Sequence, residues 1–239
     1  MRLKPAIIGV LLLLGLCVLA TATTALAYSA AGALACPLCY GFESAGSNVF
    51  IDKAAAPSTR EAAVTAVREG RARVRSFYGT VISTPRIMIC ATDSCYLKLG
   101  GRSRGMALLD IGLFIAPGEA SAVILAHELS HIELHARLGI VGTMRRDIPQ
   151  WFDEGVAVVV SDDARYLTAM KTGDRCLLSS DETLPTKRAD WVERADHDDL
   201  YKKAACRVSR WMTEHGGPQA VVSLIDAVAR RKDFAQAYR

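Results

Sequence analysis

The sequence lacks the usual marks of a nucleic-acid-binding protein. Its 239 residues contain no run of lysine and arginine interleaved with aromatic residues, and the formal net charge is only +4. Because binding to a polyanion depends on clustered positive charge, these absences argue against a nucleic-acid partner. Internal repeats and low-complexity tracts are also missing. With 51% hydrophobic residues, the chain is long enough for one compact domain with at most a small appendage.

Charged side chains are also missing from the N-terminal region, between residues 5 and 42. Arg2 and Lys4 precede this segment, and basic residues in that position favour translocation of the chain that follows. Residues 1–35 are therefore expected to be a signal peptide or a membrane anchor. Either one places the rest of the chain outside the cytoplasm, membrane-anchored or secreted, and in the periplasm if the source is bacterial.

The sequence leaves the fate of this segment open. A signal peptide would be cleaved at a site of small residues, either residues 25–27 or residues 33–35. An uncleaved anchor would span the bilayer with about 20 residues from Ala6 onward and would make the membrane a partner. A lipoprotein signal that ends at Cys36 is a third alternative, although Ala33 stands where an aliphatic residue is usual.

Six of the seven cysteines lie outside the apolar segment that contains Cys17. An even number of cysteines in an exported chain is typical of disulfide bonds. Six cysteines allow about 15 pairings, so the connectivity does not follow from the sequence. The most economical pairing joins neighbours along the chain: Cys36–Cys39, Cys90–Cys95 and Cys176–Cys206. The alternative is a zinc knuckle built from the C-x-x-C and C-x4-C pairs.

Hydrophobic periodicity predicts an α+β fold in which a small mixed or antiparallel sheet packs on several helices. A cysteine-containing linker is expected over residues 36–57, followed by one domain over residues 58–239. The sequence predicts strands at residues 81–90 and 106–115. It predicts helices at residues 58–77 and 119–138, a third helix that follows Asp147, has Pro149 in its first turn and carries residues 150–157, and two more at residues 198–215 and 218–230. Gly79 and Gly139 are expected to end the first two helices, and Asp147 to cap the third.

The pattern His127-Glu128-x-x-His131 lies within an apolar helical run, residues 122–138. Positions i and i+4 of a helix lie on the same face, so the two imidazoles can bind one Zn²⁺ ion. Glu128 lies beside them, where a carboxylate can act on a water activated by the metal. Polar residues inside a mostly apolar helix are costly unless they are paired or bound to a metal. The pattern therefore predicts a zinc site with Glu128 as the catalytic residue.

A catalytic zinc site needs a third protein ligand and one open position. A metzincin would supply a histidine six residues after His131, where this chain has Arg137. His135 shares the helix face, but three ligands spread over two turns of one straight helix cannot converge on one ion. His135 is therefore expected at the surface or behind a ligand. Glu154 is the better candidate, because residues 139–146 can turn the chain back so that the next helix faces the histidines.

H-E-x-x-H followed by W-x-x-E-G-x-A at residues 151–157 resembles the gluzincin metallopeptidases, which include thermolysin-like and aminopeptidase-like enzymes. The resemblance covers about residues 58–165, and its specific part is the two motif helices. It implies an exported zinc peptidase, expected to be an endopeptidase, that acts on peptide or protein substrates with Glu154 as the third ligand. It also implies that residues 106–115 contain an edge strand that binds the substrate backbone by β-addition.

The sequence departs from this family in two respects. The spacing from His131 to Glu154 is a few residues longer than the commonest pattern. Val158 also stands where thermolysin-like members have an aspartate that orients a zinc-binding histidine, and the nearest downstream acids are Asp162 and Asp163. The residue that orients the histidine is therefore not assigned from the sequence.

The group that stabilises the oxyanion is also left open. Members of the family use a downstream tyrosine or histidine, for which the candidates are Tyr166, His197 and Tyr201. A reading from a different functional class is a non-catalytic zinc-binding or scaffold module on a peptidase-like fold. Such a module would keep the two histidines but would have no need of Glu128.

Overall fold

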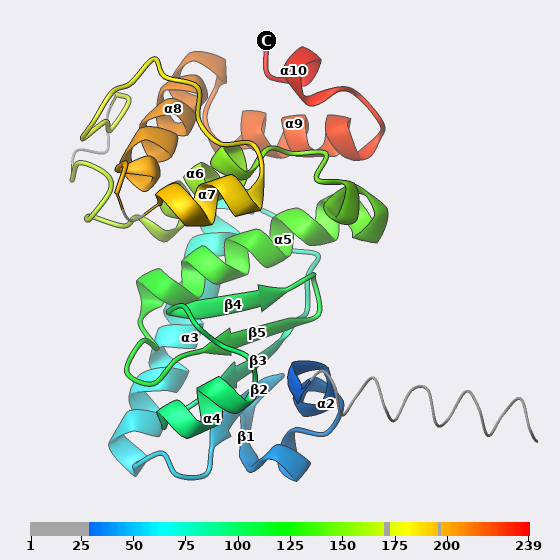
Figure 1. Cartoon of the computed structure of the whole chain (residues 1–239), viewed down its shortest axis with the longest axis vertical. Coiled ribbons are helices and arrows are strands. Elements are labelled where there is room, and N and C mark those ends of the chain that lie inside the picture. The colour runs from blue at the N-terminus through cyan, green and yellow to red at the C-terminus, as the bar shows by residue number, and fades with distance from the viewer. Residues whose placement is uncertain (1–28, 170–172, 196) are drawn as a thin grey trace, which may run out of the picture.

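The computed structural model describes residues 29–169, 173–195 and 197–239 (Figure 1). The signal-peptide, anchor and cleavage-site alternatives that concern residues 1–28 lie outside the described residues. Among the residues that are described, every helix is too short or too polar to cross a bilayer.

A five-stranded sheet forms one layer of the molecule, in the order β1-β2-β3-β5-β4 (Figure 1). The strands β2, β3 and β5 are parallel, and β1 and β4 pair antiparallel at the two edges. This confirms the expected α+β class and the mixed sheet. The strands are β1 (Phe42–Gly46), β2 (Val49–Asp52), β3 (Arg86–Ile89), β4 (Gly105–Leu108) and β5 (Gly112–Ile115).

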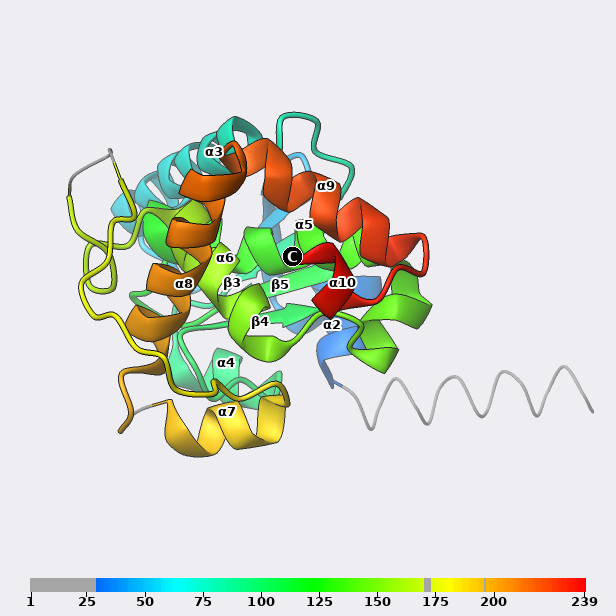
Figure 2. The same cartoon turned by 90° about the horizontal axis from the view of Figure 1, so that it is seen from above.

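Two layers of helices cover the sheet, and the side chains alternate between them with the period of a strand. Ile87 and Ile89 of β3 point into the larger core with α3 and α5, whereas Met88 points into a smaller core with α2 and α4. Helices α6, α8, α9 and α10 lie on the far side of α5 from the sheet (Figure 1), so in the view from above they lie over the sheet (Figure 2). The helices are α2 (Ser29–Ala35), α3 (Pro57–Tyr78), α4 (Asp93–Lys98), α5 (Ala122–Arg145), α6 (Gln150–Ser161), α7 (Arg188–Arg194), α8 (Leu200–His215), α9 (Pro218–Ala229) and α10 (Phe234–Ala237).

The segment predicted as a linker, residues 36–57, differs from that prediction. After a short 3-10 helix (Pro37–Tyr40), β1 and β2 form a hairpin, and β2 pairs in parallel with β3. Both strands are short, so the pattern of alternating apolar residues is too brief to stand out in the sequence. The folded body therefore includes residues on the N-terminal side of residue 58.

Helix α2 also packs into the folded body, and this bears on the two cleavage sites. Ala33 and Leu34 are buried in the smaller core. A Cβ added at Gly112 would lie 2.4 Å from Leu34 Cδ1, so that glycine permits the close approach of α2 to β5. Cleavage at residues 33–35 would remove part of this core, whereas cleavage at residues 25–27 would leave it intact.

The ends of the two long predicted helices depend on glycine. Helix α3 ends at Gly79, as predicted, and it begins after Ala56 with Pro57 in its first turn. Gly139 has φ 68° and ψ 167° and interrupts α5, and one further turn follows to Arg145. Helices α4, α7 and α10 were not predicted, because segments of four to seven residues show little periodicity.

The six cysteines in the described part of the chain form the three economical disulfides, Cys36–Cys39, Cys90–Cys95 and Cys176–Cys206. The zinc-knuckle alternative is therefore wrong, because the sulfur atoms that would bind the metal are bonded to one another. The last disulfide ties the loop after α6 to α8. Three disulfides are typical of an oxidising compartment outside the cytoplasm.

Candidate metal centre

Helices α5 and α6 form a hairpin that brings the two halves of the site together. Gly139 breaks α5, and Arg146 adopts a left-handed conformation before the chain turns into α6. The predicted Asp147 cap of α6 is wrong, since Pro149 occupies that position and Asp147 pairs with Arg145 at 2.7 Å. The first N–H groups of α6 instead donate to the carbonyls of Thr186 and Pro185.

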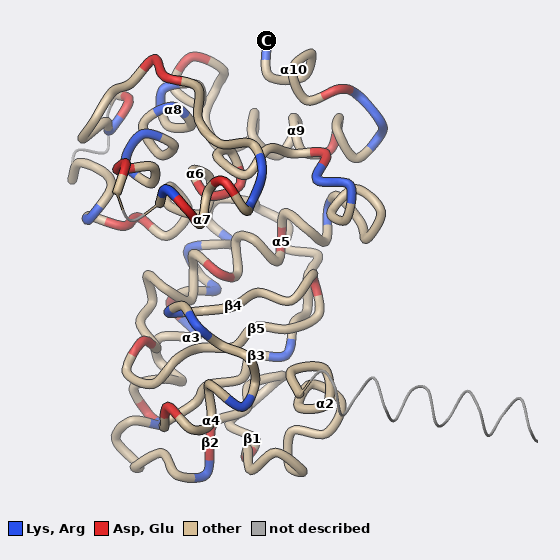
Figure 3. The backbone as a smooth tube through the Cα atoms, viewed as in Figure 1, with Lys and Arg blue, Asp and Glu red and all other residues tan. Residues whose placement is uncertain are grey.

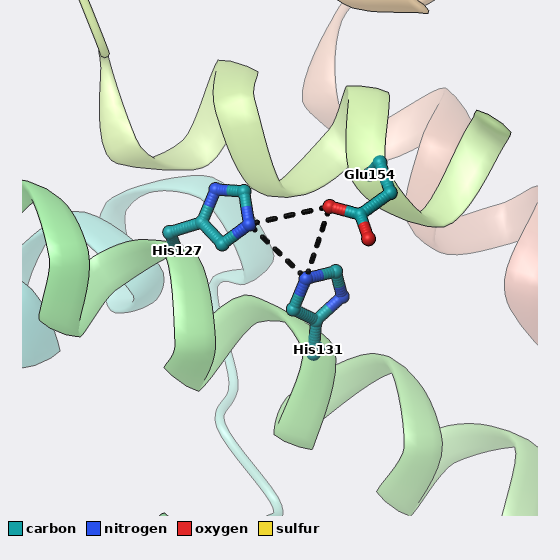
Figure 4. A group of neighbouring side chains, drawn as sticks. All are labelled: His127, His131 and Glu154. Carbon is teal, nitrogen blue, oxygen red and sulfur yellow. Dashed lines mark hydrogen bonds and ion pairs between the residues drawn. The ribbon is translucent and has the colours of Figure 1, made fainter. Parts of the chain in front are cut away.

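His127, His131 and Glu154 converge across this hairpin (Figure 4). The two histidine Nε2 atoms lie 3.2 Å apart, and Glu154 Oε2 lies 3.4 Å from the first and 3.5 Å from the second. Ligand atoms at two corners of a zinc tetrahedron with bonds of about 2.0–2.1 Å lie about 3.3–3.4 Å apart. The three side chains therefore hold their ligand atoms at the spacing of one coordination sphere, with a fourth corner free of these three residues.

Glu154 has one oxygen that the described part of the chain leaves unsatisfied. Oε1 accepts a hydrogen bond from Gln150 Nε2 at 2.9 Å, whereas Oε2 is buried and has no hydrogen-bond partner among the described residues. A buried carboxylate oxygen without a partner is costly. A cation at the centre of the triad would satisfy it, so the residues fit a metal ion with two nitrogen ligands and one oxygen ligand.

Asp153 supplies the orienting carboxylate that the sequence analysis left unassigned. Its Oδ1 lies 2.7 Å from His131 Nδ1, and its Oδ2 lies 3.5 Å from His135 Nε2. A hydrogen bond from Nδ1–H to a carboxylate fixes the tautomer and leaves Nε2 free for a metal. His135 Nδ1 lies 3.3 Å from the carbonyl oxygen of Leu109, so His135 stands behind the site, as expected, and not in the triad.

The electrostatics of the metal-free chain favour a cation at this position. Burial alone would lower the pKa of His131, but the charges of Asp153 and Glu154 outweigh it and raise that pKa well above its usual value. Burial alone would raise the pKa of Glu154, but the charge of His131 outweighs it and lowers that pKa to about 2. Burial also opposes ionisation of Asp153, but the charge of His131 outweighs it and lowers the pKa of Asp153 as well. Both carboxylates therefore stay ionised and attract positive charge.

If the triad binds a metal ion, Asp153→Asn is expected to weaken that binding by about 10- to 100-fold, the usual cost of losing an outer-shell partner of a metal-binding histidine. The amide cannot accept the Nδ1–H bond as strongly, so His131 loses its fixed tautomer and orientation. Competition with a chromophoric chelator measures the affinity. Asp181→Asn, at an exposed loop position, is the matched control, and equal affinities in both variants would contradict the orienting role.

Glu128 lies between the histidine pair and the edge strand β4. A Cβ added at Gly105, the first residue of β4, would lie 2.6 Å from Glu128 Cγ and 2.7 Å from Oε1. Burial raises the pKa of Glu128, although the charges of His127 and His131 oppose that shift. Glu128 is not one of the three converging residues, so its carboxylate remains available for proton transfer.

Of the three candidate oxyanion groups, Tyr201 lies nearest the triad. Its ring centre lies 6.3 Å from that of His127, and burial together with the charges of Glu154 and Glu128 raises the pKa of its hydroxyl. Tyr166 stacks on Tyr201, with the two ring centres 5.0 Å apart. His197 is exposed and makes no described contact with the triad.

Gly155 explains how Tyr201 reaches the site. A Cβ at Gly155 would lie 2.7 Å from the carbonyl oxygen of Ala204, so only glycine allows α8 to pack this closely on α6. Tyr201 lies in the first turn of α8, one turn before Ala204. The glycine that follows Glu154 therefore brings α8, and Tyr201 with it, against the three converging residues.

No family model, curated protein or solved structure matches the chain. The resemblance to gluzincins therefore rests on the motif and on the convergence of His127, His131 and Glu154. The geometry shows a group that could bind a metal ion, and the identity of that ion is part of the proposal below.

Proposed function

We propose that the protein is an exported, gluzincin-like zinc peptidase that hydrolyses peptide bonds with Glu128 as general base. The observation that carries this proposal is the set of three ligand atoms at tetrahedral spacing, with Glu128 outside the set but beside it. Two histidines and one glutamate form a ligand set of catalytic zinc sites, which keep a position open for water or substrate. The three disulfides support export.

Glu128 and Tyr201 have different roles in the proposed reaction. When bound, a zinc ion polarises the scissile carbonyl and lowers the pKa of water towards neutrality. Glu128 accepts the proton of the attacking water and then delivers it to the leaving amine, so that the amine departs neutral. Tyr201 donates a hydrogen bond to the tetrahedral oxyanion, and its raised pKa keeps the hydroxyl protonated for that role.

Strand β4 offers a binding edge for an extended peptide. It lies at the end of the sheet and pairs with β5 on one side. An edge strand has free N–H and C=O groups that can pair with a substrate backbone. Gly105 places this edge against Glu128, so a peptide added to β4 would run past the general base. This arrangement favours cleavage of internal bonds over removal of a terminal residue.

The proposal is tested by incubating the zinc-loaded, disulfide-bonded protein with a diverse peptide library. We expect cleavage at internal bonds, loss of cleavage after removal of the metal with a chelator, and recovery when zinc is returned. Failure of the zinc-loaded protein to cleave any peptide, or cleavage that is unaffected by the chelator, would overturn the proposal.

Gly105→Ala is expected to lower kcat by about 100-fold, the cost of a misplacement of about 1 Å. The added Cβ would lie within 2.7 Å of three atoms of Glu128, so this flexible side chain must swing away from the site. Zinc content and melting temperature should not change, because the movement is confined to the end of one side chain. Ala107→Ser, two residues along the same strand, is the control, and an equal kcat in both variants would contradict this role of Gly105.

The alternative of a non-catalytic zinc module requires a fourth protein ligand that closes the site. His135 lies against Asp153 and the carbonyl of Leu109, and the cysteines of the described chain are in disulfides. Neither supplies a fourth ligand among the described residues, which supports the catalytic proposal over the scaffold.

A further inference from the structure

An open cavity of about 1000 Å³ lies between the turn that joins α5 to α6, the start of α7 and the start of α10. Four basic and two acidic side chains contribute to its wall, which leaves a surplus of positive charge. Figure 3 shows the basic residues of the turn and of the segment before α7 in blue. These charged side chains are Arg145, Arg146, Asp147, Lys187, Arg188 and Asp233.

Three of these cations are free to bind a ligand. Arg145 pairs with Asp147 at 2.7 Å, but Arg146, Lys187 and Arg188 form no ion pair with any residue in the described ranges. All three side chains are exposed. Clustered cations without partners raise the local potential and attract an anionic group.

The segment that contains Lys187 and Arg188 is fastened to the metal centre. The carbonyl of Thr186 accepts the N–H of Gln150 at 3.0 Å, and that of Pro185 accepts the N–H of Trp151 at 3.3 Å. Gln150 also donates its side-chain N–H to Glu154 Oε1. The residue that holds the third ligand in place therefore also holds the basic segment.

One wall of the cavity lies next to the three converging residues. Trp151 and Thr186 line the cavity, and Trp151 lies three residues before Glu154 on α6, less than one helical turn away. A substrate bound at Glu128 would therefore reach the cavity within a few residues of the scissile bond.

We propose that this cavity binds a carboxylate of the substrate, with Arg188 as the principal specificity-determining residue and Arg146 and Lys187 beside it. An arginine guanidinium can hold a carboxylate through two parallel hydrogen bonds. The carboxylate belongs to an aspartate or glutamate side chain, or to the C-terminus of the peptide, near the scissile bond. This inference rests on the proposed peptidase function and gives its substrate class as acidic peptides.

The experiment compares matched peptides that differ only by glutamate or glutamine on either side of the cleaved bond, and by a free or amidated C-terminus. We expect kcat/KM of the wild-type protein to be about tenfold higher for one carboxylate than for its amide counterpart, the ratio that one charge-assisted hydrogen bond supplies. The position of the preferred carboxylate distinguishes a side chain from a C-terminus.

Arg188→Gln should reduce this ratio to near one, because the carboxylate loses its guanidinium partner. Arg68→Gln, at an exposed position of α3, should preserve the wild-type ratio. Equal cleavage of acidic and neutral peptides by the wild-type protein would overturn this inference and leave the peptidase intact, as would an acidic preference that survives in Arg188→Gln. Absence of cleavage of every peptide would overturn the peptidase itself.

Discussion

Glu128→Gln is expected to lower kcat for peptide hydrolysis by about 10²–10⁴-fold, the usual contribution of a general base. The amide has almost the same shape as the carboxylate but cannot accept the proton of the attacking water. Because Glu128 lies outside the converging triad, the variant should retain stoichiometric zinc. Steady-state kinetics and elemental analysis of the same preparation measure the two quantities together.

A suitable control is Glu61→Gln, which changes an exposed glutamate in α3 and should leave kcat unchanged. If Glu128→Gln hydrolysed peptides as fast as the wild-type protein, Glu128 would not be the general base. If it lost zinc together with activity, Glu128 would belong to the ligand set instead. A variant that keeps zinc but no longer hydrolyses peptides would favour the peptidase over the non-catalytic scaffold, because the scaffold has no need of Glu128.

Glu154→Ala is expected to abolish stoichiometric zinc binding. The two histidines of α5 would remain, but catalytic zinc sites use three protein ligands. In the wild-type protein, zinc at 100 times its dissociation constant should raise the free energy of unfolding by about 2.7 kcal/mol. The variant should gain almost none of this stabilisation. Thermal unfolding with and without added zinc, together with elemental analysis after dialysis, measures the effect.

Glu182→Ala, which removes an exposed acid, serves as the control for Glu154→Ala and should keep the full zinc-dependent stabilisation. A Glu154→Ala protein that binds zinc as tightly as the wild type would show that the third ligand lies elsewhere. A folded Glu154→Ala protein is expected without metal, because the change removes a buried oxygen that lacks a partner in the described structure.

The metal ligands could be predicted because short-range geometry decides most of their placement. The spacing of His127 and His131 fixes them on one face of a helix, whatever surrounds that helix. To place Glu154 beside the histidines, one also had to predict that the two helices form a hairpin. The glycine at residue 139 indicated where the first helix would break. The pairing of the cysteines was also a local matter, since two of the three disulfides join residues three and five positions apart.

The rest of the site depends on contacts between distant segments, which one sequence does not reveal. Asp153 lies in the first turn of α6, where an acid is favoured whether or not it has another role. It orients His131 only because α5 passes beside it. The close approaches at Gly105 and Gly155 involve Glu128 and Ala204, from other elements. The sequence alone does not show which segment packs closely against a given glycine.

The fold beyond the two motif helices was harder to predict for a different reason. Strands β1 and β2 have five and four residues, and such short runs do not establish a period of two. These residues form strands because β2 pairs in parallel with β3 in the sheet. Pairing across the sheet, and not local preference, decided the structure of residues 42–52.

Anomalous diffraction at the zinc absorption edge, from crystals of the zinc-loaded protein, tests the central claim most directly. The account predicts one strong peak about 2.0–2.1 Å from His127 Nε2, His131 Nε2 and a carboxylate oxygen of Glu154. It also predicts that no fourth side chain occupies the remaining position. A map without a peak at this point, or one in which Glu154 turns away from the metal, would contradict it.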